Sequence, residues 1–112
     1  EPARWLLTSF EWSLMAAARE LAPELPTGLL FFDPRQAAPA VEQAVSGGHS
    51  AVNPWDGAVD AVYVALAHDA GVAVNVWTVD DPARVVELAG WGADGVITNV
   101  PEVARAALGA GG

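Results

Sequence analysis

The stretch VNVWTVDDP, residues 74–82, joins a strand pattern directly to a helix start. Valines alternate along it with Asn75 and Trp77, and side chains of a β-strand alternate between its two faces. Trp77 is therefore expected at the carboxyl end of the strand, on the same face as Asn75. Asp81 and Pro82 indicate a helix start, because aspartate caps a first turn and proline lacks the amide hydrogen that this turn leaves unpaired. The expected outward set is Val72, Val74 and Val76, and the expected inward set is Ala73, Asn75 and Trp77.

Other apolar runs of strand length accompany this one, and helical patterns separate them. The run LMAAAREL, residues 14–21, consists of good helix formers. Gly71 supplies a C-terminal stop for a later helix, and Pro39 indicates that the second helix begins late, near Ala38. The apolar face expected for the third helix consists of Val59, Val62, Tyr63, Leu66 and Ala70. The five predicted strands are residues 5–8, 28–32, 50–53, 72–77 and 95–98.

Acidic side chains gather at the predicted helix starts. We expect them to be caps, because no pair of them occurs at the spacing of a cation-binding loop such as an EF-hand. The expected acidic caps are Asp33, Asp56, Asp80 and Asp81, with Asn99 as a further capping side chain before Pro101.

Strands that alternate with helices predict an α/β protein with a parallel sheet and right-handed crossovers. A doubly wound open sheet and part of a βα barrel both fit this pattern. The barrel is favoured because Asn75 places a polar side chain on the inward set and no glycine-rich phosphate loop follows a strand. Five βα units of a TIM-type barrel are incomplete on their own, since closure takes eight strands.

The composition limits the function classes. Of 112 residues, 53% are hydrophobic and the net charge is −9, which disfavours nucleic acid as a partner. The chain has no cysteine, so thiolate metal sites and cysteine nucleophiles are excluded.

No apolar run reaches the roughly 20 residues of a membrane span, so we expect a soluble protein, with the cytoplasm slightly favoured. Because the sequence opens on Glu1 close to a strand pattern, its start looks cut.

Several segments in order resemble one enzyme family. They are Ser9-Phe10 closing a strand, a helix over residues 14–22 before Pro23, AHDAG (67–71) leading into VNVWTVD (74–80), and GADGVITN (92–99) before Pro101. This ordered set resembles the carboxyl-terminal half of the glycerophosphodiester phosphodiesterase family. The resemblance spans nearly all of residues 1–112.

The resemblance implies a barrel that hydrolyses a glycerophosphodiester to glycerol phosphate and an alcohol, using a divalent cation (calcium or magnesium) and two histidines. The family's His-Arg, Glu-x-Asp and Glu-x-Lys motifs belong upstream of the matched part and do not occur in this chain. The match therefore implies strands four to eight, with no catalytic residue and no metal ligand in this chain. Asp80 stands where the family often has asparagine, and Asn99 where it often has aspartate; either side chain can cap a helix.

The candidate substrate-binding residues are Trp77, Phe10 and Ser9, which all end strands on the expected active face. By resemblance, Trp77 forms a wall for the glycerol or alcohol group, and a choline cation would lie over its indole face. The alternatives are a tryptophan that plugs the barrel mouth, a core Phe10 and a capping Ser9. Asn53, at another strand end before Pro54, needs no function, because asparagine is a common turn former.

His49 and His68 are expected on the opposite, stabilising face of the barrel, so neither is a candidate catalytic residue. Two functions remain open. One is the carboxyl-terminal part of a metal-dependent phosphodiesterase. The other is a non-catalytic half-barrel that binds or assembles, with self-association through its open sheet edges.

Overall fold

The computed structural model describes the backbone of residues 6–111 and the side chains of residues 6–109. Strands and helices alternate along this part of the chain, as the sequence predicts. The elements are β1 (Leu7–Ser9), α1 (Trp12–Leu21), β2 (Thr27–Phe31), α2 (Ala37–Gly47), β3 (Ala51–Pro54), α3 (Ala61–Asp69), β4 (Ala73–Trp77), α4 (Pro82–Gly90), β5 (Gly95–Ile97) and α5 (Pro101–Gly111), with short 3₁₀ turns η1 (Pro34–Gln36) and η2 (Asp56–Ala58).

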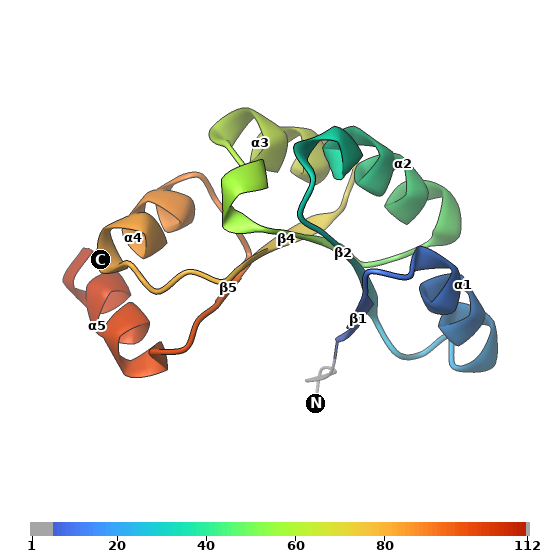
Figure 1. The fold of residues 1–112 in the computed structure, drawn as a ribbon, viewed down its shortest axis with the longest axis horizontal. Helices are drawn as coiled ribbons and strands as arrows, with labels where there is room; N and C mark the ends of the chain where they lie inside the picture. Colours follow the sequence, from blue (N-terminus) through green and yellow to red (C-terminus); the bar gives the residue numbers. More distant parts are fainter. Residues whose placement is uncertain (1–5, 112) are drawn as a thin grey trace.

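The strands form one parallel sheet in the order β1-β2-β3-β4-β5. Figure 1 shows that this sheet curls into an open arc, with the helices along its convex side. Among the described residues, β1 and β5 are edge strands, so the sheet does not close. The predicted fold class is confirmed: five parallel βα units make an incomplete barrel.

The two faces of β4 differ in burial as the alternation predicts. Val74 and Val76 are fully buried between the sheet and the helices. Asn75 and Trp77, on the other face of the strand, are only half-buried. The concave side of the sheet carries no helical layer (Figure 1). The core therefore lies between the sheet and its helical layer.

The strand bounds differ from the predicted ones by at most two residues. Trp5, which the first predicted strand includes, lies outside the described residues. The helix starts agree within two residues as well, since α1 begins at Trp12 and its predicted run at residue 14. Asp33 accepts a hydrogen bond from Arg35 N (2.9 Å), and Gly71 takes up a left-handed backbone (φ 78°) after α3. The second helix begins at Ala37, one residue before the predicted start.

The predicted apolar face of α3 is wrong in part. Val62, Leu66 and Ala70 are exposed, whereas Val64 and Ala67 are buried with Tyr63. Both sets satisfy helical spacing, because this helix carries apolar residues nearly all round. Which face of α3 turns toward the sheet therefore depends on packing against its neighbours, and the spacing of apolar residues does not determine it.

Candidate substrate-facing rim of the sheet

An aromatic pair lies at the carboxyl ends of two strands that are not neighbours. Trp77 ends β4 and Phe10 follows β1, yet their rings meet edge to face with centroids 5.6 Å apart and an interplanar angle of 83°. Two strands separate β1 from β4 in the sheet. The contact therefore crosses the concave side of the arc, and it is the curvature that brings the two rings together.

Trp77 is fixed by a hydrogen bond as well as by this contact. Its Nε1–H donates to the backbone oxygen of Asn53, at 2.8 Å, which joins the ends of β4 and β3. Since the only donor of the indole is engaged, what remains for a bound molecule is its apolar surface and π-face.

Ser9 lies at the end of β1, and the structure gives it a local partner. Its Oγ accepts a hydrogen bond from Glu11 N (3.0 Å), which holds the turn into α1. Glu11 is itself the N-cap of α1 and receives no side-chain capping bond, so the capping alternative for Ser9 is not confirmed. Its predicted contact with substrate stays a prediction.

Two asparagines lie on the concave face below the aromatic pair. Asn53 is almost fully buried (1% exposed), and neither its Oδ1 nor its Nδ2 has a hydrogen-bond partner among the described residues. Its Oδ1 lies over Gly28, where a side chain would collide with it, and Asn75 Oδ1 lies over Gly95 in the same way. Both asparagines line an open hollow of about 300 Å³ that reaches from Thr8 to β5.

Asp80 connects the loops after β4 and β5. Its Oδ1 accepts hydrogen bonds from Asn99 N (2.8 Å) and Thr98 Oγ1 (2.9 Å), and its Oδ2 accepts one from Asn99 Nδ2 (3.1 Å). These hydrogen bonds hold the pKa of Asp80 below its ordinary value, and the bond from the Asn99 backbone contributes most. The predicted cap at Asp80 is therefore wrong. Its carboxylate instead joins the loop after β4 to the loop after β5 at the carboxyl edge of the sheet.

Of the other predicted acidic caps, Asp81 is confirmed and Asp56 is wrong. Asp81 Oδ1 accepts from Ala83 N (3.0 Å) and caps α4 as expected. Asp56 does not cap; it accepts from Arg84 Nε (2.7 Å) and ties η2 to α4. Asp60, which the sequence reading missed, caps α3 through Tyr63 N (2.8 Å).

Both histidines lie at the amino ends of strands, opposite the rim. The Nδ1 atom of His49 is 2.7 Å from Thr27 Oγ1, at the start of β2. Its other ring nitrogen is buried with no partner among the described residues. Burial lowers the pKa of His49, and the positive charge of the nearby Arg19 guanidinium lowers it further. His68 Nε2 lies 2.8 Å from Asp94 Oδ2, beside the start of β5.

Within residues 6–111, no group of three or more His, Cys, Asp or Glu side chains could hold a metal ion. The rim carboxylates of Asp80 and Asp81 are engaged in the hydrogen bonds described above. The same part of the chain has no helix long and apolar enough to cross a membrane.

The curled parallel sheet, its outer helices and its aromatic rim define a segment of a TIM-type barrel protein. The sequence profile of the Glycerophosphoryl diester phosphodiesterase family matches residues 1–103, and the chain belongs to this family. A comparison with curated protein sequences finds no match.

Solved structures of related proteins share this fold. One, described as a glycerophosphoryl diester phosphodiesterase from Silicibacter pomeroyi, is 31% identical (TM-score 0.81), over 92% of this chain and 37% of its own. Another, an Oleispira antarctica phosphodiesterase in complex with the product sn-glycerol-3-phosphate, is 21% identical (TM-score 0.84), over 93% of this chain and 41% of its own. The second likeness shows the fold alone. The chain spans about two fifths of the length of the solved structures it matches.

Proposed function

We propose that this chain, residues 1–112, is the carboxyl-terminal portion of a metal-dependent phosphodiesterase barrel that hydrolyses glycerophosphodiesters to glycerol phosphate and an alcohol. The family match over residues 1–103 supports the reaction class. The observation that carries a role for this chain is the contact between Phe10 and Trp77 at the carboxyl ends of the strands, where barrel enzymes bind substrate.

In this proposal the chain binds and orients the substrate. Trp77 and Phe10 form an apolar wall against the glycerol or alcohol group, and a choline cation would lie over the indole face. The hydroxyl of Ser9 accepts a hydrogen bond from Glu11 N, so its own hydrogen is available to a substrate oxygen.

The catalytic centre and the divalent cation, calcium or magnesium, belong in this proposal to the rest of the barrel. The described residues do not fit a metal ion, so the roles assigned to this chain involve none. Its contribution to the reaction is positional, because it holds the non-reacting part of the substrate at the mouth of the barrel.

A chimera tests the proposal. The part of the Silicibacter pomeroyi protein that this chain does not match is fused to residues 1–112, and glycerol phosphate release is measured with calcium, magnesium or manganese. We expect turnover by the fusion and none by the 112-residue chain alone. A folded fusion without turnover, or a chain that turns over alone at enzymatic rates, contradicts the proposal.

The second candidate is a non-catalytic half-barrel that binds or assembles. The open edges of the sheet at β1 and β5 favour it, because unpaired strand edges are ready sites for association. The fusion separates the two candidates, since a binding module gains no turnover when the barrel is completed.

A further inference from the structure

A second tryptophan lies at the rim beside Trp77. Trp55 follows β3 directly, keeps the extended backbone of the strand (φ −61°, ψ 146°) and forms a parallel bridge with Trp77. It is two residues beyond Asn53, so its side chain belongs to the same concave face of the sheet. Its backbone N–H donates to the oxygen of Phe31 at 2.8 Å, which fixes it to β2 as well. Trp55 and Trp77 are therefore neighbours at the ends of adjacent strands.

The indole of Trp55 is exposed and rests on the turn that follows it. The residue is 44% exposed, although it is a large aromatic. Its six-membered ring lies so close over Gly57 that a methyl group at Gly57 would collide with it. Gly57 belongs to η2, so this turn forms the surface under the ring. The exposed remainder of the indole is an aromatic surface available to a bound molecule.

Arg84 of α4 holds this turn in place. Its Nε donates to the carboxylate of Asp56 at 2.7 Å. Its Nη2 donates to the backbone oxygens of Asp56 (3.2 Å) and Val59 (3.4 Å). The guanidinium also lies over the ring of Trp91, 4.8 Å from its centroid. Both ends of η2 are thus bound to one side chain.

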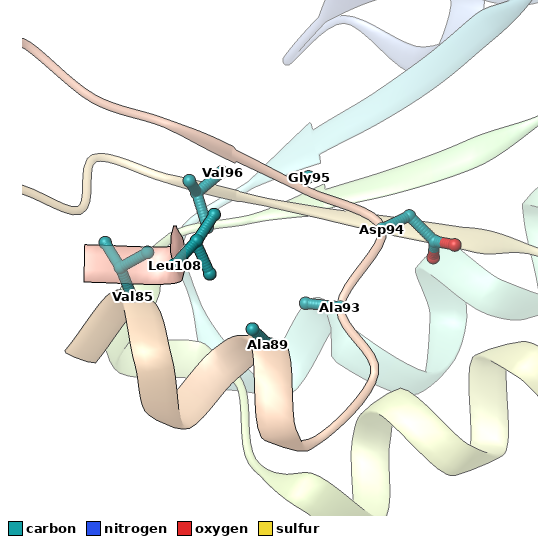
Figure 2. A pocket seen from close by; sticks show the side chains of 7 residues that line it. All are labelled: Val85, Ala89, Ala93, Asp94, Gly95, Val96 and Leu108. Carbon is teal, nitrogen blue, oxygen red and sulfur yellow. The ribbon is translucent and has the colours of Figure 1, made fainter. Parts of the chain in front are cut away.

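The helix that carries Arg84 is itself packed firmly. Val85, the next residue of α4, is 1% exposed, and Figure 2 shows it beside Val96 of β5 and Leu108 of α5. Because α4 is the helix that follows β4, it belongs to the same βα unit as Trp77. Arg84 therefore fixes the turn under Trp55 relative to the strand that ends in Trp77.

The loops that follow the five strands carry more acidic than basic side chains. Arg35 is bound to Asp33, and Arg84 reaches in from α4 to Asp56, which leaves an excess of negative charge around the two indoles. Such an excess favours a cationic group over a neutral or anionic one. The acidic side chains of these loops are Glu11, Asp33, Asp56, Asp60, Asp80 and Asp81.

We propose that Trp55 is a specificity-determining residue that binds the alcohol group of the diester where this alcohol carries a quaternary ammonium group, and that Arg84 is its positioning residue. A cation is attracted to the face of an indole, and two indoles on neighbouring strands offer more of this surface than one. The acidic loops favour the same class of alcohol. The inference rests on the proposed function, in which Trp77 forms one wall of this site.

Binding to the 112-residue chain tests Trp55 without turnover. NMR follows the indole N–H signals while glycerophosphocholine is added, and the signal of Trp55 is the one that the Trp55→Phe chain lacks. We expect this signal to shift in a saturable way. The ester of 3,3-dimethylbutanol has the shape of the choline ester without its cation, and it should bind about fivefold more weakly or less tightly still.

Kinetics of the active fusion test the role in specificity. Trp55→Ala should raise KM for glycerophosphocholine about five- to tenfold with kcat nearly unchanged, and KM for the dimethylbutanol ester by less than about twofold. Leu66→Ala truncates a similarly exposed apolar residue on α3, and this matched control should leave both KM values unchanged.

The positioning role of Arg84 has its own variants. Arg84→Gln should raise KM for glycerophosphocholine, but it should add little in the Trp55→Ala background, because it acts through Trp55. Gly57→Ala displaces the ring while Arg84 keeps its partners, and it should raise the same KM. Melting curves identify any variant that fails to fold. Strictly additive effects of Arg84→Gln and Trp55→Ala overturn the positioning role.

Two results overturn the role of Trp55: a signal that does not shift with glycerophosphocholine, or KM values for the two esters that rise equally in Trp55→Ala. If the fusion is active and either result is found, the inference fails and the proposed function stands. If the fusion folds without turnover while the Trp55 signal of the chain still shifts, the proposed function fails and the binding role stands.

Discussion

Asp80 and Asn99 bind each other across the ends of β4 and β5, with the carboxylate accepting from both the backbone and the side-chain amide of Asn99. The family pattern that this chain resembles often has the reverse, asparagine at the first position and aspartate at the second. The reciprocal exchange keeps one carboxylate and one amide at the contact. Both departures from the pattern therefore concern one interaction, where the sequence alone suggests two independent caps.

A double-mutant cycle tests this pairing. Asp80→Asn removes the carboxylate, and Asn99→Asp places two carboxylates together, so each should lower the melting temperature. The double variant restores one of each kind and should recover most of the loss. Thermal unfolding of the four chains measures the coupling; strictly additive losses would show that the two residues act independently.

The stability of the chain should depend on pH through His49. Its pKa in the folded chain is lowered by burial and by Arg19, whereas an unfolded histidine titrates near pH 6.5. Below about pH 6.5 the unfolded chain therefore binds more protons, so the contribution of His49 is complete above this pH and is lost progressively below it. Urea unfolding between about pH 7 and 5 should show a steeper loss for the original chain than for His49→Gln. Parallel profiles would contradict this.

Trp77 should act as a pocket wall in the active fusion. Trp77→Ala removes both wall and hydrogen bond, and should lower kcat/KM mainly by raising KM. Trp77→Phe keeps an aromatic wall and loses the bond to Asn53 O, so KM should change little while stability falls by about 0.5–1.5 kcal/mol. If Trp77→Ala keeps full efficiency and loses the roughly 3–5 kcal/mol typical of a core tryptophan, the residue is a plug.

The free chain should associate as its concentration rises, because the edges of β1 and β5 carry unpaired backbone groups. Sedimentation over a range of concentrations measures this. A monomer that persists at every concentration would contradict this expectation, and it would also argue against a half-barrel that assembles through its open edges.

Much of the fold could be predicted from local pattern. The alternation around Asn75 and Trp77 gave the two faces of β4 correctly, and capping aspartates marked the starts of η1 and α4. The buried face of α3 could not be predicted, since Val62 and Val64 are equally apolar and only packing distinguishes them.

The places of the candidate residues at strand ends were predictable but their contacts were not, and substrate binding by Trp77, Phe10 and Ser9 stays a prediction. Strand ends placed Phe10 and Trp77 on one rim, yet their meeting depends on how strongly the sheet curls. The bond from Trp77 to Asn53 O and the roles of Asp56 and Asp80 likewise join segments far apart in sequence. The one available signal was the paired departure of Asp80 and Asn99 from the family pattern.

The asparagines over Gly28 and Gly95 restrict the order in which this barrel interior can evolve. Asn53 Oδ1 occupies the space that a methyl group at Gly28 would need, and Asn75 Oδ1 does the same above Gly95. A larger residue at either glycine requires the asparagine side chain above it to move, whereas a smaller residue in place of the asparagine removes this conflict. In each pair, a substitution that shortens the asparagine is therefore permissive for a substitution that enlarges the glycine.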